Sequence, residues 1–137
     1  MYKILEKKVL APQIYLMDIE APRVAKAAKP GQFVIVVADD KGERVPLTIC
    51  DYDTEKGTVN IVIQTIGAST KKISQLEKGD YLRDFVGPLG RPSDYVNEDL
   101  EEVKKRKYLF VAGGVGTAPV YPQARWFKEN GIDVDVI

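Results

Sequence analysis

The sequence predicts a small all-β barrel followed by the first β-α-β portion of an α/β unit. Short alternating or apolar segments, separated by turn residues, fill positions 1–90, a pattern typical of small barrels. From residue 107 onward an apolar segment, a glycine turn and a helical segment follow one another, as in α/β proteins. The 137 residues are enough for one ordinary core or for one small domain plus part of another.

Composition is typical of globular proteins and removes several classes of function. Twenty Lys plus Arg balance twenty Asp plus Glu, so no net field favours nucleic acid or an anionic membrane surface. The absence of histidine excludes Ser–His–Asp and Cys–His catalysis. Cys50 is the single cysteine, which excludes an internal disulfide and an iron–sulfur or zinc site built from several thiolates of this chain.

The N-terminal residues 1–20 mix charged and apolar residues. They contain no uninterrupted apolar stretch of signal-peptide or transmembrane length. We therefore expect a cytoplasmic protein without a membrane partner.

Strands of the barrel are delimited by proline, glycine and polar turns. Pro30-Gly31 precedes a purely apolar run, and the segments 39–42 and 53–57 have the make-up of hairpin turns. A short helix is predicted at Thr70–Leu76. The predicted strands are Tyr2–Leu10, Gln13–Ile19, Phe33–Val37, Val45–Cys50, Thr58–Thr65 and Tyr81–Val86. Such a set favours a closed or nearly closed barrel, which avoids exposed edges.

A charged connection follows the barrel. The acidic run 98–102 precedes the basic run 104–107, which indicates a solvated helix with neighbouring opposite charges. We expect a domain boundary near residue 100, with a barrel at 1–100 and the start of an α/β domain at 101–137.

The glycine turn at 113–117 follows the apolar run Tyr108–Ala112, which suits a parallel strand buried on both faces. Thr117 is expected to cap a helix in which Pro119 needs no backbone donor. Such a turn can bind phosphate through free N–H groups, or it can simply connect strand to helix. The spacing departs from the dinucleotide fingerprint because Pro119 stands where its third glycine would be.

The strand around Pro46 carries a second signal. Alternation directs Val45, Leu47 and Ile49 toward the core, and directs Arg44, Pro46, Thr48 and Cys50 to the other face. That second face suits a ligand, although an ordinary edge strand with an exposed arginine remains open. Because proline lacks an N–H, this part of the strand is expected at an edge or an opening.

A third signal is the sequence GAST at 67–70, where a strand ends and two hydroxyls begin a helix. Its first N–H groups suit a phosphate. Alternatively, Ser69 or Thr70 serves only as the helix cap.

Four segments in this order resemble the ferredoxin–NADP reductase superfamily: RVPLT at 44–48, GAST at 67–70, GPLGRP at 87–92 and GGVGTAP at 113–119. Within it, they resemble the electron-transfer subunits of dihydroorotate dehydrogenase and the small subunit of NADH-dependent ferredoxin–NADP oxidoreductase, also described as a sulfide dehydrogenase subunit. The resemblance covers essentially the whole chain, and the joint order is more specific than any one segment.

The resemblance implies an FAD-binding Greek-key barrel and an NAD(P)H-binding α/β domain. Hydride would pass from nicotinamide to flavin, and electrons would leave one at a time through a [2Fe–2S] cluster toward a larger catalytic or iron–sulfur flavoprotein subunit, or toward ferredoxin. Arg44 would face the FAD phosphates, and the pyrophosphate would bind at the 67–70 turn. The implied cofactor-binding residues are Arg44, Val45, Pro46, Leu47, Thr48, Val62, Ile63, Gln64, Gly67, Ser69 and Thr70 for FAD, and Gly113, Gly114, Gly116, Thr117 and Pro119 for the nicotinamide dinucleotide.

Two departures from the family pattern stand out. Pro46 replaces the aromatic residue that many plant-type reductases place against the flavin, as it does in nearer relatives. Relatives also continue for roughly another hundred residues by the usual size of such a domain, and that part would supply the cluster cysteines. We therefore expect this chain to be a truncated form, inactive alone.

Two other functions stay open from the sequence. A non-catalytic nucleotide- or partner-binding barrel would use the apolar surface that an unfinished α/β layer exposes. An oligonucleotide-binding barrel is disfavoured by zero net charge and by few aromatics outside the predicted core.

Overall fold

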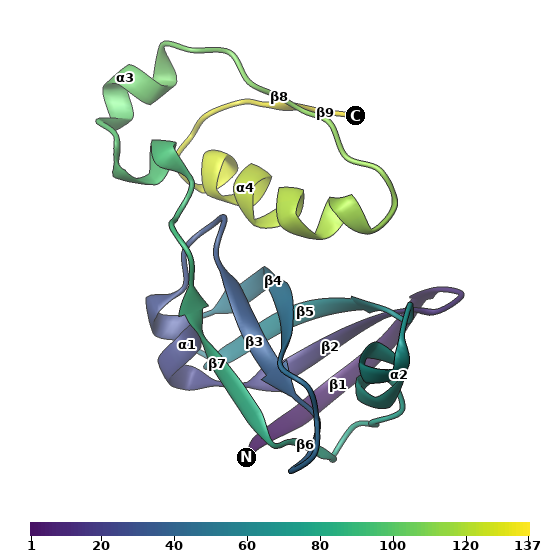
Figure 1. Ribbon diagram of the computed structural model, residues 1–137. Coiled ribbons are helices and arrows are strands. Elements are labelled where there is room, and N and C mark those ends of the chain that lie inside the picture. Colours follow the sequence, from purple (N-terminus) through teal and green to yellow (C-terminus); the bar gives the residue numbers. More distant parts are fainter.

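The computed structural model describes residues 1–137 as a β-barrel with a smaller α/β layer packed on one end (Figure 1). Seven strands form one antiparallel sheet in the order β6-β1-β2-β5-β4-β3-β7. Their bounds are β1 Tyr2–Ala11, β2 Ile14–Glu20, β3 Phe33–Val37, β4 Val45–Asp53, β5 Thr58–Gln64, β6 Tyr81–Leu82 and β7 Asp84–Leu89. The order β2-β5-β4-β3 is a Greek key, with the long connection between β2 and β3.

The barrel closes through a corner that the sequence did not reveal. The segment predicted as one strand, Tyr81–Val86, is divided at Arg83 into β6, which pairs with β1, and β7, which pairs with β3. The two ends of the strand order are therefore joined by a single residue, whose N–H donates to the Val37 carbonyl over 2.9 Å. This corner leaves the sheet nearly closed and protects its edges.

The barrel core consists of the inward side chains of the alternating strands. Seventeen buried residues form one cluster, which includes Val34, Ile61 and Phe85. Helix α1, Pro22–Ala27, covers one end and buries Val24 and Ala25. No helix was predicted there, because six residues are too few for a periodic apolar pattern.

Helix α2, Ala68–Ser74, covers another part of the barrel and inserts Ile73 into the same core. Lys7 of β1 holds its C-terminal end, because the ammonium donates to the Ser74 carbonyl over 2.7 Å and pairs with Glu77 over 2.6 Å. The N-terminal end of α2, which carries the predicted phosphate turn, is thereby held at a defined place.

The α/β layer has its own small core. It contains α3 Leu100–Lys104, β8 Leu109–Phe110, α4 Thr117–Glu129 and β9 Asp135–Val136, with β8 and β9 parallel as predicted. Phe127 is fully buried, with ring centroids 4.5 Å from Tyr95 and 4.4 Å from Tyr108. Tyr95 precedes the predicted boundary near residue 100 yet packs with this second cluster, so the position of that boundary stays a prediction.

Three predictions concern the charged helix α3 and the glycine turn with its flanking residues. The solvated charged helix is confirmed, with ion pairs inside 98–106. The burial of Tyr108–Ala112 on both faces is wrong: Leu109 is 59% exposed and Val111 69%, because α4 covers only one face of β8. The capping role of Thr117 is also wrong, since α4 begins at Thr117 and its start has no side-chain cap.

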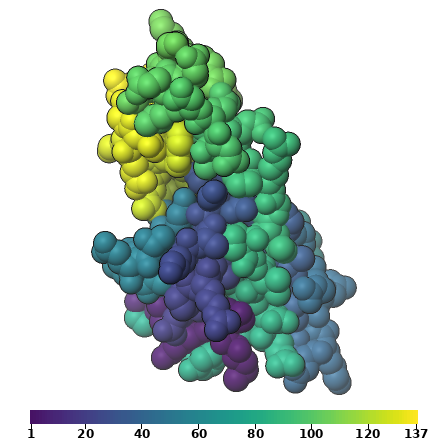
Figure 2. Space-filling view, turned by 90° about the vertical axis from the view of Figure 1, so that its left-hand side faces the viewer, coloured from purple at the N-terminus to yellow at the C-terminus, as the bar shows by residue number.

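Helix α4 rests directly on the barrel, mainly on β4 (Figure 2). No helix of the structure combines the length and the apolar character needed to cross a membrane.

Candidate functional site

The two strand segments predicted to line a ligand lie where the barrel sheet opens. The first half of β4, Val45–Thr48, pairs only with β3, and the second half pairs only with β5. Beyond Ile61, β5 pairs only with β2, so Val62–Gln64 and Val45–Thr48 diverge from each other. Each segment has a backbone edge without a strand partner at this opening. The expectation that Pro46 lies at an opening is confirmed.

Alternation along β4 distributes its side chains as predicted. Ile49 is buried in the barrel core, and Val45 and Leu47 pack against it. Pro46 and Arg44 are exposed. No ion pair of the structure uses Arg44. Arg44 is therefore a cation available to an anionic ligand, whereas Val45 and Leu47 offer only their backbone.

The turn at 67–70 lies at the same end of the barrel, directly after β5. Thr70 Oγ1 accepts hydrogen bonds from the N–H groups of Ile66 and Gly67, both over 3.0 Å, and donates to the Gly67 carbonyl over 3.0 Å. The N-cap residue of α2 is Gly67, so neither Ser69 nor Thr70 is the helix cap that the alternative interpretation expected; Thr70, at the third helical position, closes the turn by binding back to Gly67. The first N–H groups of α2 have no partner inside the helix.

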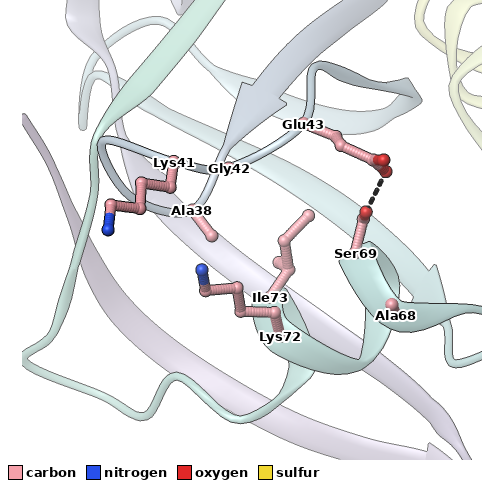
Figure 3. Close-up of a pocket in the computed structure, with 8 residues that line it drawn as sticks. All are labelled: Ala38, Lys41, Gly42, Glu43, Ala68, Ser69, Lys72 and Ile73. Carbon is pink, nitrogen blue, oxygen red and sulfur yellow. Dashed lines mark hydrogen bonds between the residues drawn. The ribbon is translucent and has the colours of Figure 1, made fainter.

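A hollow of about 220 Å³ separates this turn from the loop before β4 (Figure 3). Ser69 and Lys72 line it from α2, and Lys41 and Glu43 line it from the loop. The Ser69 hydroxyl donates to the Glu43 carboxylate across the hollow. Lys41 and Lys72 bring two ammonium groups to the hollow, of which Lys72 is paired with Asp39. Together with the Ser69 hydroxyl, they can bind an anion.

The glycine turn before α4 is open. A Cβ atom built on Gly113, Gly114 or Gly116 would meet no protein atom within 4 Å, in contrast to Gly31 or Gly87, where it would clash. Gly114 has φ +55°, which other residues rarely adopt. The Gly113 N–H donates no backbone hydrogen bond. Internal packing therefore does not explain the three glycines, and backbone can be approached closely there.

An apolar cleft of about 290 Å³ lies between the barrel and this turn. Cys50 and Val62 line its barrel side, and Gly114 and Thr117 line the opposite side. The structure thus brings together residues from two of the predicted segments. Sequence reasoning missed further lining residues that come from β1, β2, the glycine turn and α4: Leu10, Ala11, Ile14, Leu16, Val115, Ala118 and Tyr121.

Other predicted residues lie away from this cleft. Ile63 is fully buried in the barrel core, so its side chain cannot touch a ligand. Gln64 is exposed at the end of β5, and Pro119 is half-buried in the first turn of α4. Ser69 lines the separate hollow beside α2. An elongated ligand could place a ring in the apolar cleft and its phosphates in the hollow beside α2.

Cys50 contributes an uncharged thiol to the cleft. Burial, and to a lesser degree the charge of Asp51, raises the pKa of Cys50 to about 11. The thiol is therefore protonated at neutral pH and acts as a small apolar surface.

The fold and these turns define a class of protein: they are similar to those of reductases of the ferredoxin–NADP reductase type. No protein-family model matches the sequence. Among curated proteins, it is 64% identical over 137 residues to a protein of Clostridium beijerinckii described as an uncharacterized protein in the adh 3′ region, covering 100% of this chain and 46% of that protein.

Two further similar proteins have descriptions that state a function. The chain is 38% identical to a dihydroorotate dehydrogenase B (NAD⁺) electron transfer subunit homolog of Thermotoga maritima, covering 98% of this chain and 45% of that protein. It superposes with a TM-score of 0.87 on a structure of the NADH-dependent reduced ferredoxin–NADP oxidoreductase, at 35% identity and covering 99% of this chain and 47% of that one. The chain spans about half the length of the relatives it matches.

Proposed function

We propose that this chain binds FAD on its barrel and takes part in electron transfer between NAD(P)H and an iron–sulfur partner. The observation that carries the proposal is the apolar cleft between the opened strands and the glycine turn. It places a ring-binding surface of the barrel opposite a turn suited to a dinucleotide. Relatives described as electron transfer subunits, and as an NADH-dependent ferredoxin–NADP oxidoreductase, support the same function.

The residues present fit FAD. A flavin ring needs an apolar slot with polar atoms at its edge. Val62 lines the apolar cleft, and the divergent edges of Val45–Thr48 and Val62–Gln64 have backbone groups without a strand partner. The FAD phosphates need cations and N–H donors, which Arg44 and the start of α2 supply. Bound flavin supplies the chemistry, accepting hydride from reduced nicotinamide and releasing single electrons.

Each group of the chain has a separate task in this proposal. Arg44 neutralises phosphate charge, and the N–H groups of Ser69 and Thr70 donate to phosphate oxygens. Pro46 and Thr48 border the ring, and the thiol of Cys50 helps to exclude water from the cleft. Gly113, Gly114 and Gly116 let the nicotinamide dinucleotide approach the backbone, with Thr117 and Pro119 beginning the helix beneath it.

Glu43 must move for this binding mode. Its carboxylate accepts a hydrogen bond from Ser69, so a phosphate at that position would meet a like charge. The side chain is exposed and is free to turn toward solvent. In this proposal, a phosphate replaces the carboxylate as the acceptor of the Ser69 hydroxyl.

The electron acceptor lies outside these residues. A [2Fe–2S] cluster needs four ligands, mostly thiolates, and this sequence has one cysteine. We propose that a cluster in the part of the protein corresponding to the remaining length of the relatives, and then a larger catalytic subunit or ferredoxin, receives the electrons. NADH and NADPH are equally compatible with the glycine turn.

The test begins with the visible spectrum of the gently purified protein and titration of the apoprotein with FAD. We expect flavin absorption and release of FAD on denaturation. Arg44→Gln should weaken FAD binding by roughly tenfold or more, since a hydrogen bond between charged groups contributes about 1.5–3 kcal/mol. Arg83→Gln is the matched control, because Arg83 is an exposed barrel arginine paired with Asp40. A colourless protein that does not bind added FAD would refute the proposal.

A second candidate is a partner-binding module without flavin. It is favoured by the exposed apolar side chains Leu109, Val111, Val136 and Ile137 on the β8–β9 layer. A stable dimer that binds no chromophore would support this candidate over the first.

A further inference from the structure

A β-bulge in β4 changes the direction of Asp51. Ile49 lies opposite Ile61 and Asp51 lies opposite Asn60, so β4 has one residue more than β5 between these pairs. In a regular strand Asp51 would follow Ile49 onto the core face. The extra residue reverses this, because Asp51 now pairs with Asn60, which lies between the buried residues Val59 and Ile61 and therefore faces outward.

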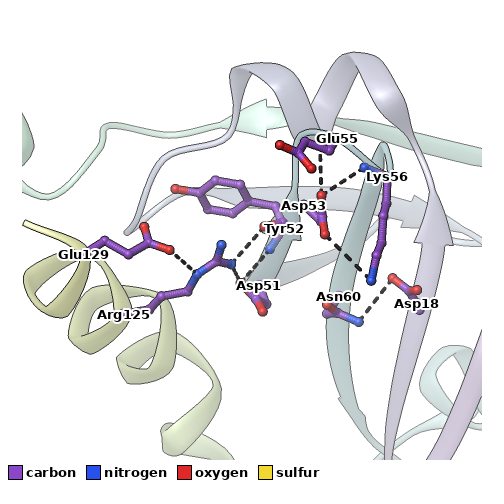
Figure 4. A network of polar contacts seen from close by, with 9 residues as sticks. All are labelled: Asp18, Asp51, Tyr52, Asp53, Glu55, Lys56, Asn60, Arg125 and Glu129. Atoms are coloured by element: carbon purple, nitrogen blue, oxygen red, sulfur yellow. Dashed lines mark hydrogen bonds and ion pairs between the residues drawn. The ribbon is translucent and has the colours of Figure 1, made fainter.

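The outward carboxylate of Asp51 meets Arg125 of α4 (Figure 4). The same guanidinium nitrogen also donates to the Tyr52 carbonyl over 2.9 Å. The guanidinium carbon lies 5.8 Å from the centre of the Tyr52 ring. Arg125 Nε donates to Glu129 of its own helix over 2.8 Å, which orients the side chain toward β4. The side chains of Arg125 and Asp51 are only 37% and 27% exposed, so water screens their contact less than it screens the pairs at the surface.

Strand β4 and helix α4 each contain residues of the proposed site, and each also contains one residue of the Asp51–Arg125 contact. β4 begins with Val45–Thr48 at the opening and reaches Asp51 after the bulge. α4 begins at Thr117 beside the glycine turn and reaches Arg125 about 12 Å further along its axis. Because α4 is one continuous helix from Thr117 to Arg125, its contact with β4 at Arg125 also fixes the position of the glycine turn relative to the opened strands.

A second contact holds α4 from the connecting segment. Gln123 Oε1 accepts hydrogen bonds from the Ser93 hydroxyl over 2.8 Å and from the Tyr95 hydroxyl. Ser93 and Tyr95 belong to the segment that follows β7. The Arg125 contact is thus the polar link between α4 and β4 itself.

We propose that Arg125 and Asp51 are positioning residues that set the separation of the nicotinamide-binding turn from the flavin-binding strands. This inference rests on the proposed function for its role, while the contact itself can be tested without flavin. Neither residue touches the cleft, so loss of the pair releases α4 and leaves the flavin-binding strands intact.

The first measurement is hydrogen exchange of the 137-residue chain without added cofactor. Arg125→Gln and Asp51→Ala should each speed exchange of the α4 amides by about tenfold, the size expected for loss of one charge-assisted hydrogen bond. Arg125→Lys keeps the charge but cannot fork between Asp51 and the Tyr52 carbonyl, so its effect should be intermediate. Amides of β1, β2 and β5 should keep their exchange rates.

The second measurement uses Trp126, the single tryptophan, which lies on α4 beside Arg125. With FAD bound, Arg125→Gln should reduce energy transfer from Trp126 to the flavin, while the dissociation constant of FAD stays within about twofold of wild type. Arg106→Gln is the matched control, since Arg106 pairs with Glu98 at similar exposure but within the α/β layer.

The outcomes separate the two proposals. If wild type does not bind FAD, the proposed function fails, and hydrogen exchange still tests the contact. If FAD binds, but Arg125→Gln and Asp51→Ala leave both α4 exchange and energy transfer like those of Arg106→Gln, the positioning role is overturned. A large loss of FAD affinity in these variants would also overturn it, because that result would assign them to the flavin site itself.

Discussion

Cys50 illustrates how one residue acquires its chemistry from its surroundings. It lies within the bulge of β4, buried between the barrel and the glycine turn. Desolvation disfavours its thiolate, which is the reactive form of cysteine. The residue is therefore suited to packing in the cleft rather than to nucleophilic or redox chemistry.

We predict slow alkylation of Cys50 by iodoacetamide at pH 7.5. Burial raises its pKa from 9.0 to about 11, which lowers the thiolate fraction by about 100-fold relative to the unfolded chain. The same protein in denaturant is the control, and equal rates in the two states would contradict the prediction. Because the folded pKa is the higher one, this group's contribution to stability is complete below pH 9 and is lost as the pH rises toward 11.

At the scale of elements, α2 joins a structural and a proposed binding role. Its C-terminal end is held by Lys7, and Ile73 anchors it in the barrel core. The hydroxyl of Thr70 accepts the Gly67 N–H and closes the turn before α2, and Ser69 of the first turn lines the hollow shared with Glu43. The 67–70 turn therefore stabilises the start of α2 and also forms part of the proposed phosphate site.

Thr70→Ala should destabilise the protein by about 1 kcal/mol, the usual net contribution of an intramolecular hydrogen bond. Two N–H groups, those of Ile66 and Gly67, lose their acceptor in this variant. Urea unfolding followed by circular dichroism measures the change. Thr70→Ser keeps the hydroxyl and should stay within a few tenths of a kcal/mol of wild type; equal losses in both variants would show that the hydroxyl is not responsible.

At the scale of the whole molecule, two separate cores support the proposed site from opposite sides. The barrel cluster of seventeen residues and the smaller cluster around Val103, Phe127 and Ile132 share no member. The cleft lies between the units that they stabilise. Motion of one unit against the other would therefore change the cleft before it disturbed either core.

Phe127→Ala should unfold the α/β layer locally and leave the barrel folded. The ring contacts four other aromatic rings, and its loss should cost about 3–5 kcal/mol within a small cluster. We expect red-shifted Trp126 emission and fast exchange of α4 amides, with β2 and β5 amides still protected. Val34→Ala, in the barrel core, is the comparison. Simultaneous loss of all protection in Phe127→Ala would show instead that the two cores unfold as one.

Local sequence was enough to locate strands β1 to β5, the inward set Val45, Leu47 and Ile49, and the strand–turn–helix–strand order of the α/β layer. These features depend on local alternation and turn residues, which a single segment contains. The bounds of β3, Phe33–Val37, follow directly from its apolar run and the preceding Pro30-Gly31. The family resemblance also rests on such local segments.

How these segments pack against one another becomes visible in the three-dimensional structure. The corner at Arg83, the bulge that directs Asp51 toward Arg125, the exposure of Leu109 and Val111, and the cleft that joins Cys50 to Gly114 all depend on which element lies opposite. A residue's burial and its partner are properties of two segments far apart in sequence, and no pattern within one segment contains the register between them.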